Sequence, residues 1–257
     1  MKKALVLFVA LVGMATLSLS SVWASGHGAA SAFNPAEALK RIVDGNNAFV
    51  THHAKKYFKD YANAQHPFVT MITCSDARVH PTVFNADPVD HVFVIRNVGN
   101  QIQNSCGSID YGIYHLHTPV LLIIGHTHCG AVKAAMGNYV NESPCIIAEL
   151  NGLHLPLKHD DGKGTFEERW LLNVERNVDY QVNFCIKKYA DLVKSGKLAV
   201  VGAVYDFLNA YGQGEGRLII TNINGITDPA MIKKDPHMSL VDSKLKNAIV
   251  TRKTKGI

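Results

Sequence analysis

The sequence lacks the cysteine patterns that several classes of redox and metal proteins share. Its 257 residues contain five cysteines and no Cys-x-x-Cys pair, which excludes a thioredoxin-like redox site. Neither half of the zinc-deaminase signature, His-x-Glu and Pro-Cys-x-x-Cys, occurs. An odd number of widely spaced cysteines is also unlike a disulfide framework. The cysteines are therefore better explained as metal ligands or as small buried side chains.

The sequence also has no strong excess of positive or of negative charge. The formal net charge is +5 at pH 7 and falls to +3 without Lys2 and Lys3. No cluster of Lys and Arg residues alternates with aromatic residues, as a groove for RNA or DNA would require. We therefore expect no nucleic-acid partner.

The one long hydrophobic run stands at the N-terminus. Residues 1–24 combine a charged start, an apolar segment through Leu19 and small residues before Ser25, which is the pattern of a cleavable secretory signal peptide. The alternative is an uncleaved membrane anchor, but the apolar segment is short for a bilayer span. We expect export to a bacterial periplasm, or secretion, with no membrane attachment after cleavage. Such a compartment would permit one disulfide among three cysteines: Cys106, Cys145 and Cys185.

The remaining sequence is predicted to form one domain with an N-terminal helical arm. Residues 25–33 are rich in Gly, Ala and Ser and predict a flexible start of the mature chain. Asn34 and Glu37, which flank Pro35, predict a capped helix start. This arm either covers its own domain or packs on a partner subunit. We assign residues 34–242 to the domain and expect residues 243–257 to be a basic, disordered tail.

Apolar runs and helical spacing alternate along the domain. Five short runs predict strands: 68–73, 91–95, 120–124, 198–205 and 217–221. Helical patterns are predicted for four longer segments: 105–117, 129–136, 144–155 and 166–193, the last of them long and interrupted. This alternation predicts an α/β fold with a mainly parallel sheet flanked by helices.

Two polar runs directly follow the first and third predicted strands. The first contains Cys74, Asp76 and Arg78 at alternate positions, and the second contains His126 and Cys129. Reacting groups in α/β sheets collect beyond the carboxyl ends of the strands, so we expect these side chains to meet there. Two thiolates and one imidazole are donors that zinc accepts, and three protein ligands are typical of a catalytic zinc site.

Asp76 has a different predicted role from the three metal donors. On an extended backbone it faces the same way as Cys74 and Arg78. An Asp paired with an Arg stays ionised and is held off the metal, from where it can orient a zinc-bound hydroxide. The alternative is an ordinary surface ion pair between Asp76 and Arg78.

These residues resemble the motifs of the β-class carbonic anhydrases, which are zinc enzymes. The family pattern Cys-x-Asp-x-Arg followed by His-x-x-Cys is present, and the residues from Arg96 to Asn100 match the family motif Arg-Asn-x-x-Asn. The resemblance covers roughly residues 35–225. It implies one zinc ion per subunit, assembly as a homodimer or a dimer of dimers, and reversible hydration of carbon dioxide to bicarbonate and a proton.

The resemblance also implies residues that bind substrate. Gln65 stands where the plant-type branch has a substrate-binding Gln. Gly130 matches a residue whose backbone N–H helps to bind substrate in that branch. The implied apolar wall near the zinc, part of which comes from the partner subunit, has three members: Phe93, Val98 and Tyr111.

At one position the sequence differs from the family pattern, and this difference bears on the branch to which the chain belongs. Some bacterial members bind bicarbonate at a regulatory site built from Trp, Arg and Tyr; Arg96 and Tyr205 match that site, but Met71 stands at the Trp position. This departure favours the plant-type branch. Two other functions stay open: hydrolysis of carbon disulfide or carbonyl sulfide on the same scaffold, and a non-catalytic periplasmic zinc-binding protein.

Overall fold

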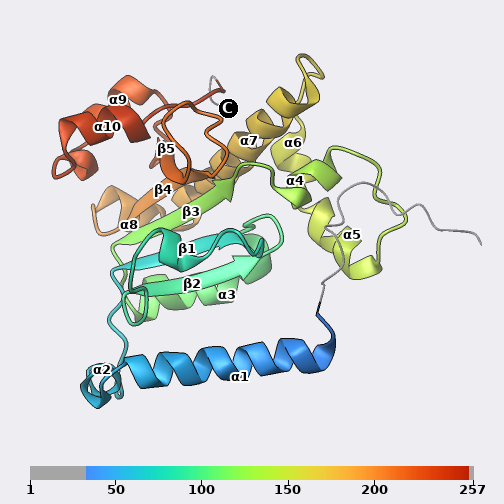
Figure 1. Ribbon diagram of the computed structural model, residues 1–257. Helices are drawn as coiled ribbons and strands as arrows, with labels where there is room; N and C mark the ends of the chain where they lie inside the picture. The colour runs from blue at the N-terminus through green and yellow to red at the C-terminus, as the bar shows by residue number, and fades with distance from the viewer. Residues whose placement is uncertain (1–32, 255–257) are drawn as a thin grey trace, which may run out of the picture.

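The centre of the fold is a five-stranded sheet (Figure 1). The computed structural model describes residues 33–254; the expected signal peptide and nearly all of the expected flexible start lie outside this range. The strands are β1 (Val69–Cys74), β2 (Val92–Asn97), β3 (Val120–His126), β4 (Ala199–Asp206) and β5 (Arg217–Ile223). Their order is β2-β1-β3-β4-β5, with only the β4–β5 pair antiparallel. The predicted α/β class with a mainly parallel sheet is confirmed.

Helices connect the strands and cover both faces of the sheet. They are α1 (Pro35–His52), α2 (Lys55–Lys59), α3 (Cys106–Asp110), α4 (Gly130–Ala135), α5 (Pro144–Asn151), α6 (His154–Leu157), α7 (Phe166–Lys188), α8 (Ala190–Lys194), α9 (Pro229–Lys234) and α10 (Ser243–Ile249). Short 3₁₀ turns lie at Pro81–Val83, Gln103–Ser105 and Pro236–Met238, and a π-helical turn at Tyr111–His115. Within residues 33–254, no helix combines the length and the hydrophobicity that crossing a bilayer requires.

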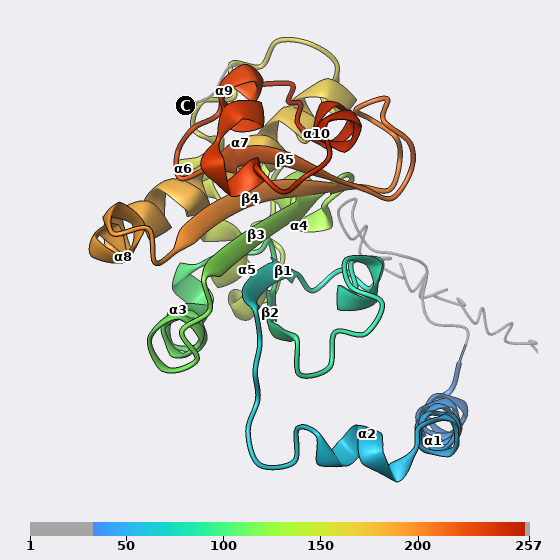
Figure 2. The same cartoon turned by 90° about the vertical axis from the view of Figure 1, so that its left-hand side faces the viewer.

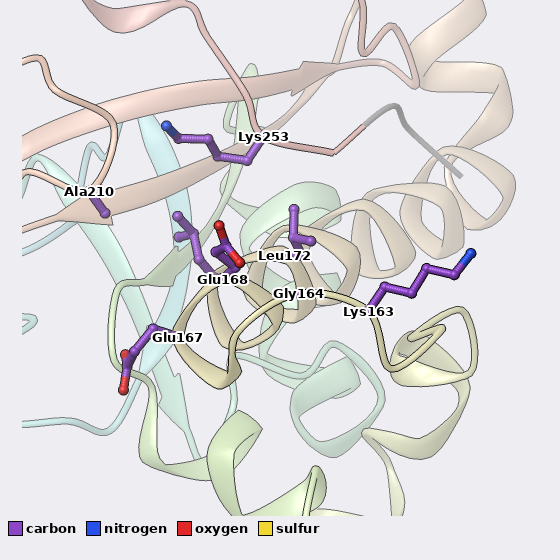
Figure 3. A pocket seen from close by; sticks show the side chains of 8 residues that line it. Lys163, Gly164, Glu167, Glu168, Leu172, Ala210 and Lys253 are labelled. Carbon is purple, nitrogen blue, oxygen red and sulfur yellow. The ribbon is translucent and has the colours of Figure 1, made fainter.

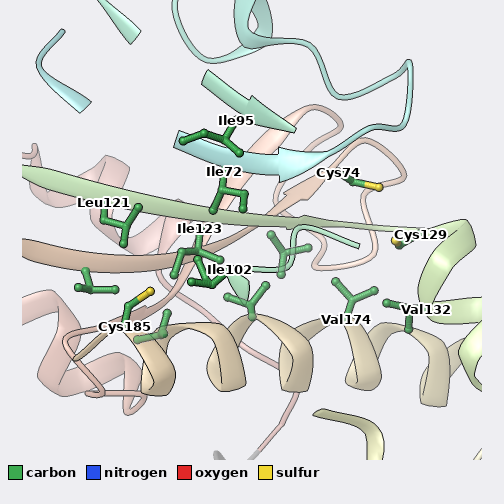
Figure 4. Packing of buried hydrophobic residues seen from close by; sticks show 14 of the residues in the cluster. Ile72, Cys74, Ile95, Ile102, Leu121, Ile123, Cys129, Val132, Val174 and Cys185 are labelled. Carbon is green, nitrogen blue, oxygen red and sulfur yellow. The ribbon is translucent and has the colours of Figure 1, made fainter. Parts of the chain in front are cut away.

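Helix α7 packs closely against one face of the sheet (Figure 4). It begins with a reciprocal cap in which the Thr165 hydroxyl accepts from the Glu168 N–H and the Glu168 carboxylate accepts from the Thr165 N–H. Gly125 and Gly202 allow the close approach. A Cβ on Gly125 would lie 2.8 Å from a methyl group of Val178, and a Cβ on Gly202 would lie 2.7 Å from the other. This packing puts the start of α7 beside the carboxyl ends of β1 and β3.

The predicted helices differ from the observed ones where the chain packs most tightly. The segment 105–117 is a short α-helix followed by the π-helical turn, since the backbone of Gly112 lies directly against Thr70 of β1. The segment 144–155 divides into α5 and α6 around Gly152. In both segments tertiary contacts override the helical spacing of the sequence. The segment 166–193 is interrupted as predicted, and it divides into α7 and α8 at Tyr189.

The expectation of a disordered tail from residue 243 is wrong through residue 254. Residues 243–249 form α10, and Val250 pairs with Ile220 of β5. The Arg252 side chain is only 4% exposed and donates to Asp179 of α7 over 2.7 Å. Backbone N–H groups of the next two residues donate to the Glu175 carboxylate. The segment is ordered because it supplies the cation and the donors that two buried acids require.

Helix α1 stands apart from the sheet (Figures 1 and 2). None of its residues is buried, although Leu39, Ile42 and Val43 form an apolar face at helical spacing and each is more than half exposed. Its start is capped as the sequence predicts, with the Asn34 and Glu37 side chains each accepting from the other's backbone N–H. Among the described residues, the body of the domain therefore leaves this apolar face uncovered.

Replacing Arg252 with alanine is expected to lower the free energy of unfolding by about 3–5 kcal/mol, because Asp179 and Glu175 would stay buried without a cation. The matched control is Lys40→Ala, which breaks an exposed ion pair with Asp44 and should cost at most about 0.5 kcal/mol. Urea denaturation measures both. Equal losses in the two variants would contradict the assigned role of the C-terminal segment.

Candidate metal centre

Three buried donors meet at the carboxyl edge of the sheet. Cys74 ends β1, His126 ends the neighbouring strand β3, and Cys129 is the residue before α4. Their ligand atoms lie within 4.8 Å of one another, and all three residues are at most 5% exposed. The two sulfurs lie at one end of the packed core, whereas Cys185 lies at the other (Figure 4). The structure thus brings together the three residues that the sequence predicts as metal ligands.

The His126 ring is oriented for binding a metal. Its Nδ1 lies 2.9 Å from the Thr127 carbonyl oxygen, so Nδ1 carries the proton and donates. Its Nε2 is buried and has no hydrogen-bond partner among residues 33–254. A backbone carbonyl that fixes the other ring nitrogen is a usual companion of a metal-binding histidine. The unpaired Nε2 therefore points to a cation between the ring and the sulfurs.

The two sulfurs influence each other's ionisation. The neighbouring Cys129 side chain lowers the pKa of Cys74, whereas the Cys74 side chain and complete burial raise the pKa of Cys129. The backbone at the start of α4, at Ala131 and Val132, acts in the opposite direction on Cys129 and favours its thiolate. A backbone that favours negative charge on sulfur suits metal binding.

Asp76 lies beside this cluster and is held by Arg78. The guanidinium donates to both carboxylate oxygens, over 2.9 and 2.6 Å, and the Arg78 N–H adds a third bond of 3.0 Å. These bonds lower the pKa of Asp76 to about 2. The carboxylate is 3.9 Å from His126 Nε2, and the guanidinium lies over the Phe207 ring, 4.6 Å from its centroid. Asp76 is thus ionised, close to the donors and directed toward Arg78.

The donor set fits zinc. Two thiolates and one neutral imidazole are common zinc ligands, and the unpaired His126 Nε2 shows that the third donor is ready to bind. The nearest carboxylate, Asp76, is engaged by Arg78. Three protein ligands would leave one coordination position of zinc for water or substrate, which is the arrangement of catalytic sites.

The other predicted site residues divide into two groups. Gly130 is the first residue of α4, next to Cys129, and Val98 follows the end of β2, whose last residue pairs with Cys74. Phe93 pairs with Thr70 near the start of β1, about 13 Å along the strand from Cys74.

Two further predicted residues lie with Phe93 rather than with the metal donors. The Tyr111 ring stacks on Phe93 at 5.9 Å between centroids, and Gln65 is exposed in the loop before β1. Within one chain, the structure does not bring Gln65, Phe93 and Tyr111 to the metal donors.

Three residues around the centre were not identified from the sequence: Trp170, Glu167 and Gln101. Trp170 of α7 donates from Nε1 to the Cys129 carbonyl oxygen over 2.9 Å, and its ring stacks on His128. The His128 Nε2 is 2.9 Å from a Glu167 carboxylate oxygen. Gln101 is buried behind the Val98–Gly99 turn. The local sequence gives no signal for these residues, because their partners are far away in the chain.

A hollow of about 530 Å³ lies on the far side of the first turns of α7 (Figure 3). It is lined by Leu171 and Leu172, with Lys163 and Lys253 at its sides, and it shares Glu167 with the pair described above. None of the three donors, nor Asp76 or Arg78, lines it. The chemistry of the side chains, rather than the size of a hollow, therefore locates the site.

The Asp76–Arg78 pair should make stability depend on pH in a defined window. The pKa of Asp76 in the folded protein is about 2, below the usual value of about 3.9 expected in the unfolded chain. Its stabilisation is therefore complete above about pH 4 and is lost as the pH falls toward 2. Arg78→Met is expected to be less stable than the wild type above pH 4, with the difference shrinking toward pH 2. Urea denaturation of metal-free protein measures this; a difference that does not change with pH would contradict it.

Comparisons with known proteins identify the family. A sequence model described as carbonic anhydrase matches residues 69–212, more than half of the chain. Carbonic anhydrase 2 of Mycobacterium tuberculosis is 27% identical over 191 residues, which cover 67% of this chain and 88% of that protein. Beta carbonic anhydrase 3 of Arabidopsis thaliana is 27% identical over 68% of this chain and 76% of that protein. A carbonic anhydrase of Synechococcus elongatus is 33% identical, but the match spans only 40% of its length.

The fold is shared with solved structures of the same class. The β-carbonic anhydrase of Coccomyxa, solved in complex with acetazolamide, superposes with a TM-score of 0.62 at 27% identity, covering 76% of this chain and 91% of that one. Because bacterial and plant relatives match at the same identity, the plant-type branch stays a prediction. The family match contains both strand ends that carry the cysteine and histidine donors, and the chain therefore belongs to the β-class of the carbonic anhydrase family of enzymes.

Proposed function

We propose that this chain catalyses the reversible hydration of carbon dioxide to bicarbonate and a proton. The observation that carries the proposal is a set of three buried donors beside a carboxylate that Arg78 holds in place. Cys74, His126 and Cys129 would hold one zinc ion. When bound, zinc acts as a Lewis acid that makes water a nucleophile near neutral pH.

Asp76 would orient the reacting water. The Arg78 side chain holds the pKa of this carboxyl at about 2, so near neutral pH it is ionised, accepts a hydrogen bond and does not donate one. A water that donates to Asp76 has its lone pair directed toward the substrate, which lowers the entropy cost of reaching the reactive geometry. Arg78 occupies both carboxylate oxygens and keeps the side chain from rotating toward the metal donors.

The substrate would lie between Val98 and the start of α4. Carbon dioxide has no charge, so an apolar wall suits it, and the exposed side chain of Val98 supplies one next to Asn97, which pairs with Cys74. As the oxygens of the product gain charge, the Gly130 N–H at the first residue of α4 is placed to donate to one of them. Gln65 would bind a second oxygen, as the family resemblance implies.

Assembly with a second copy of the chain would complete this site. Gln65, Phe93 and Tyr111 lie at the opposite end of β1 from the donors, so they reach a metal site only if it belongs to another copy. Strand β2 is an edge of the sheet, and the apolar face of α1 is exposed. We propose a homodimer, or a dimer of dimers, in which these two surfaces contact the partner subunit.

We also propose that the mature protein acts in the periplasm. The support is the signal-peptide pattern of residues 1–24, and secretion is the other outcome of the same pattern. Detection of the protein in a periplasmic extract, starting at Ser25, would support this location.

Cys74→Ser is expected to lower the affinity for zinc by about 100-fold or more, since a direct ligand should matter at least as much as its supporting residues. The matched control is Cys185→Ser, which changes an equally buried thiol at the other end of the core and should keep its zinc. Metal analysis after dialysis against a chelator measures both. Full zinc content in the Cys74→Ser protein would refute the site.

Asp76→Asn is expected to keep zinc and to hydrate carbon dioxide about 100-fold or more slowly in kcat/KM, because the neutral amide is a weaker acceptor for the reacting water and replaces one acceptor oxygen with an NH2 donor. Asp161→Asn, at an exposed acid of the α6–α7 loop, is the matched control and should leave the rate unchanged. Stopped-flow hydration measures the rates.

The same preparations separate the alternative functions. Release of hydrogen sulfide from carbon disulfide or carbonyl sulfide, without carbon dioxide hydration, would favour the hydrolase. A zinc-loaded wild type with neither activity would favour a zinc-binding protein without catalysis.

A further inference from the structure

The metal donors His126 and Cys129 are joined by a tight turn at Thr127 and His128. His128 has a φ of +53°, in the left-handed region that residues other than glycine seldom adopt. Such a conformation persists only where surrounding contacts hold it. The contacts of this turn therefore bear directly on where the Cys129 sulfur lies.

Trp170 of α7 contacts the last two residues of this stretch at the same time. Its Nε1 donates to the Cys129 carbonyl oxygen over 2.9 Å. Its ring lies on the His128 ring, with 4.4 Å between the centroids and 11° between the planes. Because Trp170 is only 7% exposed, its N–H needs an acceptor inside the protein, and the Cys129 carbonyl oxygen is that acceptor.

The Cys129 carbonyl oxygen is also the point at which α4 begins. It accepts from the Lys133 N–H over 3.0 Å, which is the first hydrogen bond of that helix. The Lys133 Nζ lies over the Trp170 ring, 5.2 Å from its centroid. The residue that carries the sulfur is therefore fastened to two helices, α4 and α7, through one oxygen atom.

The carbonyl of His128 connects the same turn to the Asp76–Arg78 pair. Arg78 Nη2 donates to the His128 carbonyl oxygen over 3.3 Å and to the Asp76 carboxylate over 2.6 Å. A change in the backbone at His128 would move one of these two acceptors. On the outer side of the turn, the Glu167 carboxylate lies 2.9 Å from His128 Nε2. Both of these side chains are partly exposed, so this contact orients the ring but adds little to stability.

We propose that Trp170, assisted by Glu167, is a positioning residue of the zinc site that holds the turn before Cys129. The turn then keeps the Cys129 sulfur beside the other two donors and keeps Arg78 on Asp76. The inference rests on the proposed zinc site. Partners of metal ligands commonly contribute about 10- to 100-fold in metal affinity. Trp170 acts through the backbone of a ligand residue, so we expect an effect at the lower end of this range.

Two substitutions of Trp170 separate its N–H from its ring. Trp170→Phe keeps a ring that can stack on His128 and loses the donor to the Cys129 carbonyl oxygen. Its affinity for zinc, measured by competition with a chelator at one pH, is expected to fall by about 10-fold. Trp170→Leu loses both contacts and should bind zinc more weakly still. In the cobalt-substituted proteins, the visible absorption bands should change, because they depend on how the ligands surround the metal.

The matched control is Tyr211→Phe, which also removes one hydrogen-bond donor from a buried aromatic side chain. The Tyr211 hydroxyl donates to the Glu175 carboxylate of α7 over 2.7 Å, and the residue is 6% exposed. The substitution leaves the contacts of the turn in place. It should lower the free energy of unfolding without changing zinc affinity or the cobalt bands.

Glu167 provides a test that does not endanger the fold, should neither Trp170 variant fold. Glu167→Ala removes the outer contact of the His128 ring and is expected to lower zinc affinity with little loss of stability. Glu167→Gln retains an oxygen that can accept from His128 Nε2 and should keep the wild-type affinity. Equal affinities of wild type, Glu167→Ala and Glu167→Gln would then overturn the proposal.

The outcomes separate this inference from the proposed function. A wild type that binds no zinc would refute the proposed function itself. A wild type that binds zinc, with Trp170 variants of equal affinity and unchanged cobalt bands, would overturn only the positioning role. Equal affinity losses in Trp170→Phe and Tyr211→Phe would overturn it too, since the effect would then be general.

Discussion

The structure of the site depends on the burial of two sulfurs and one imidazole nitrogen at one edge of the sheet. Taking polar atoms out of water is costly unless each finds a partner. Within residues 33–254, His126 Nε2 has no hydrogen-bond partner. A metal ion would remove this imbalance, because it would accept all three lone pairs at once. Metal binding would therefore add to the stability of the folded protein.

The parallel register of the sheet brings these donors to the same edge of the sheet. β1 and β3 are neighbours and end together, with Thr73 opposite Ile124. α4 then starts immediately beyond, so that backbone N–H groups face the Cys129 sulfur. The glycines on β3 and β4 allow α7 to approach, and through Trp170 the helix holds the Cys129 carbonyl oxygen. The same sheet edge therefore supplies the ligands, their donors and their rigidity.

The sequence predicts the elements that local patterns determine and not those that depend on distant contacts. All five strands, the capped start of α1 and the start of α7 lie close to their predicted places, because apolar runs and capping residues act locally. The metal donors were predictable because they directly follow strands. The broken helix at Gly112 and the ordered segment around Arg252 were not, since each depends on a contact with residues far away in the sequence. Gln101 was overlooked for the same reason: a single Gln gives no sign of which carbonyl it will bind.

The buried acids of α7 have a consequence for the order in which the protein matures. Asp179 lies on the helix that covers the sheet, yet its guanidinium partner follows 73 positions later in the chain. During synthesis, the helix must wait for the ribosome to add Arg252 before its charge is compensated. Until then Asp179 and Glu175 would be buried without their cation, which disfavours closure of the domain before its last residues have been added.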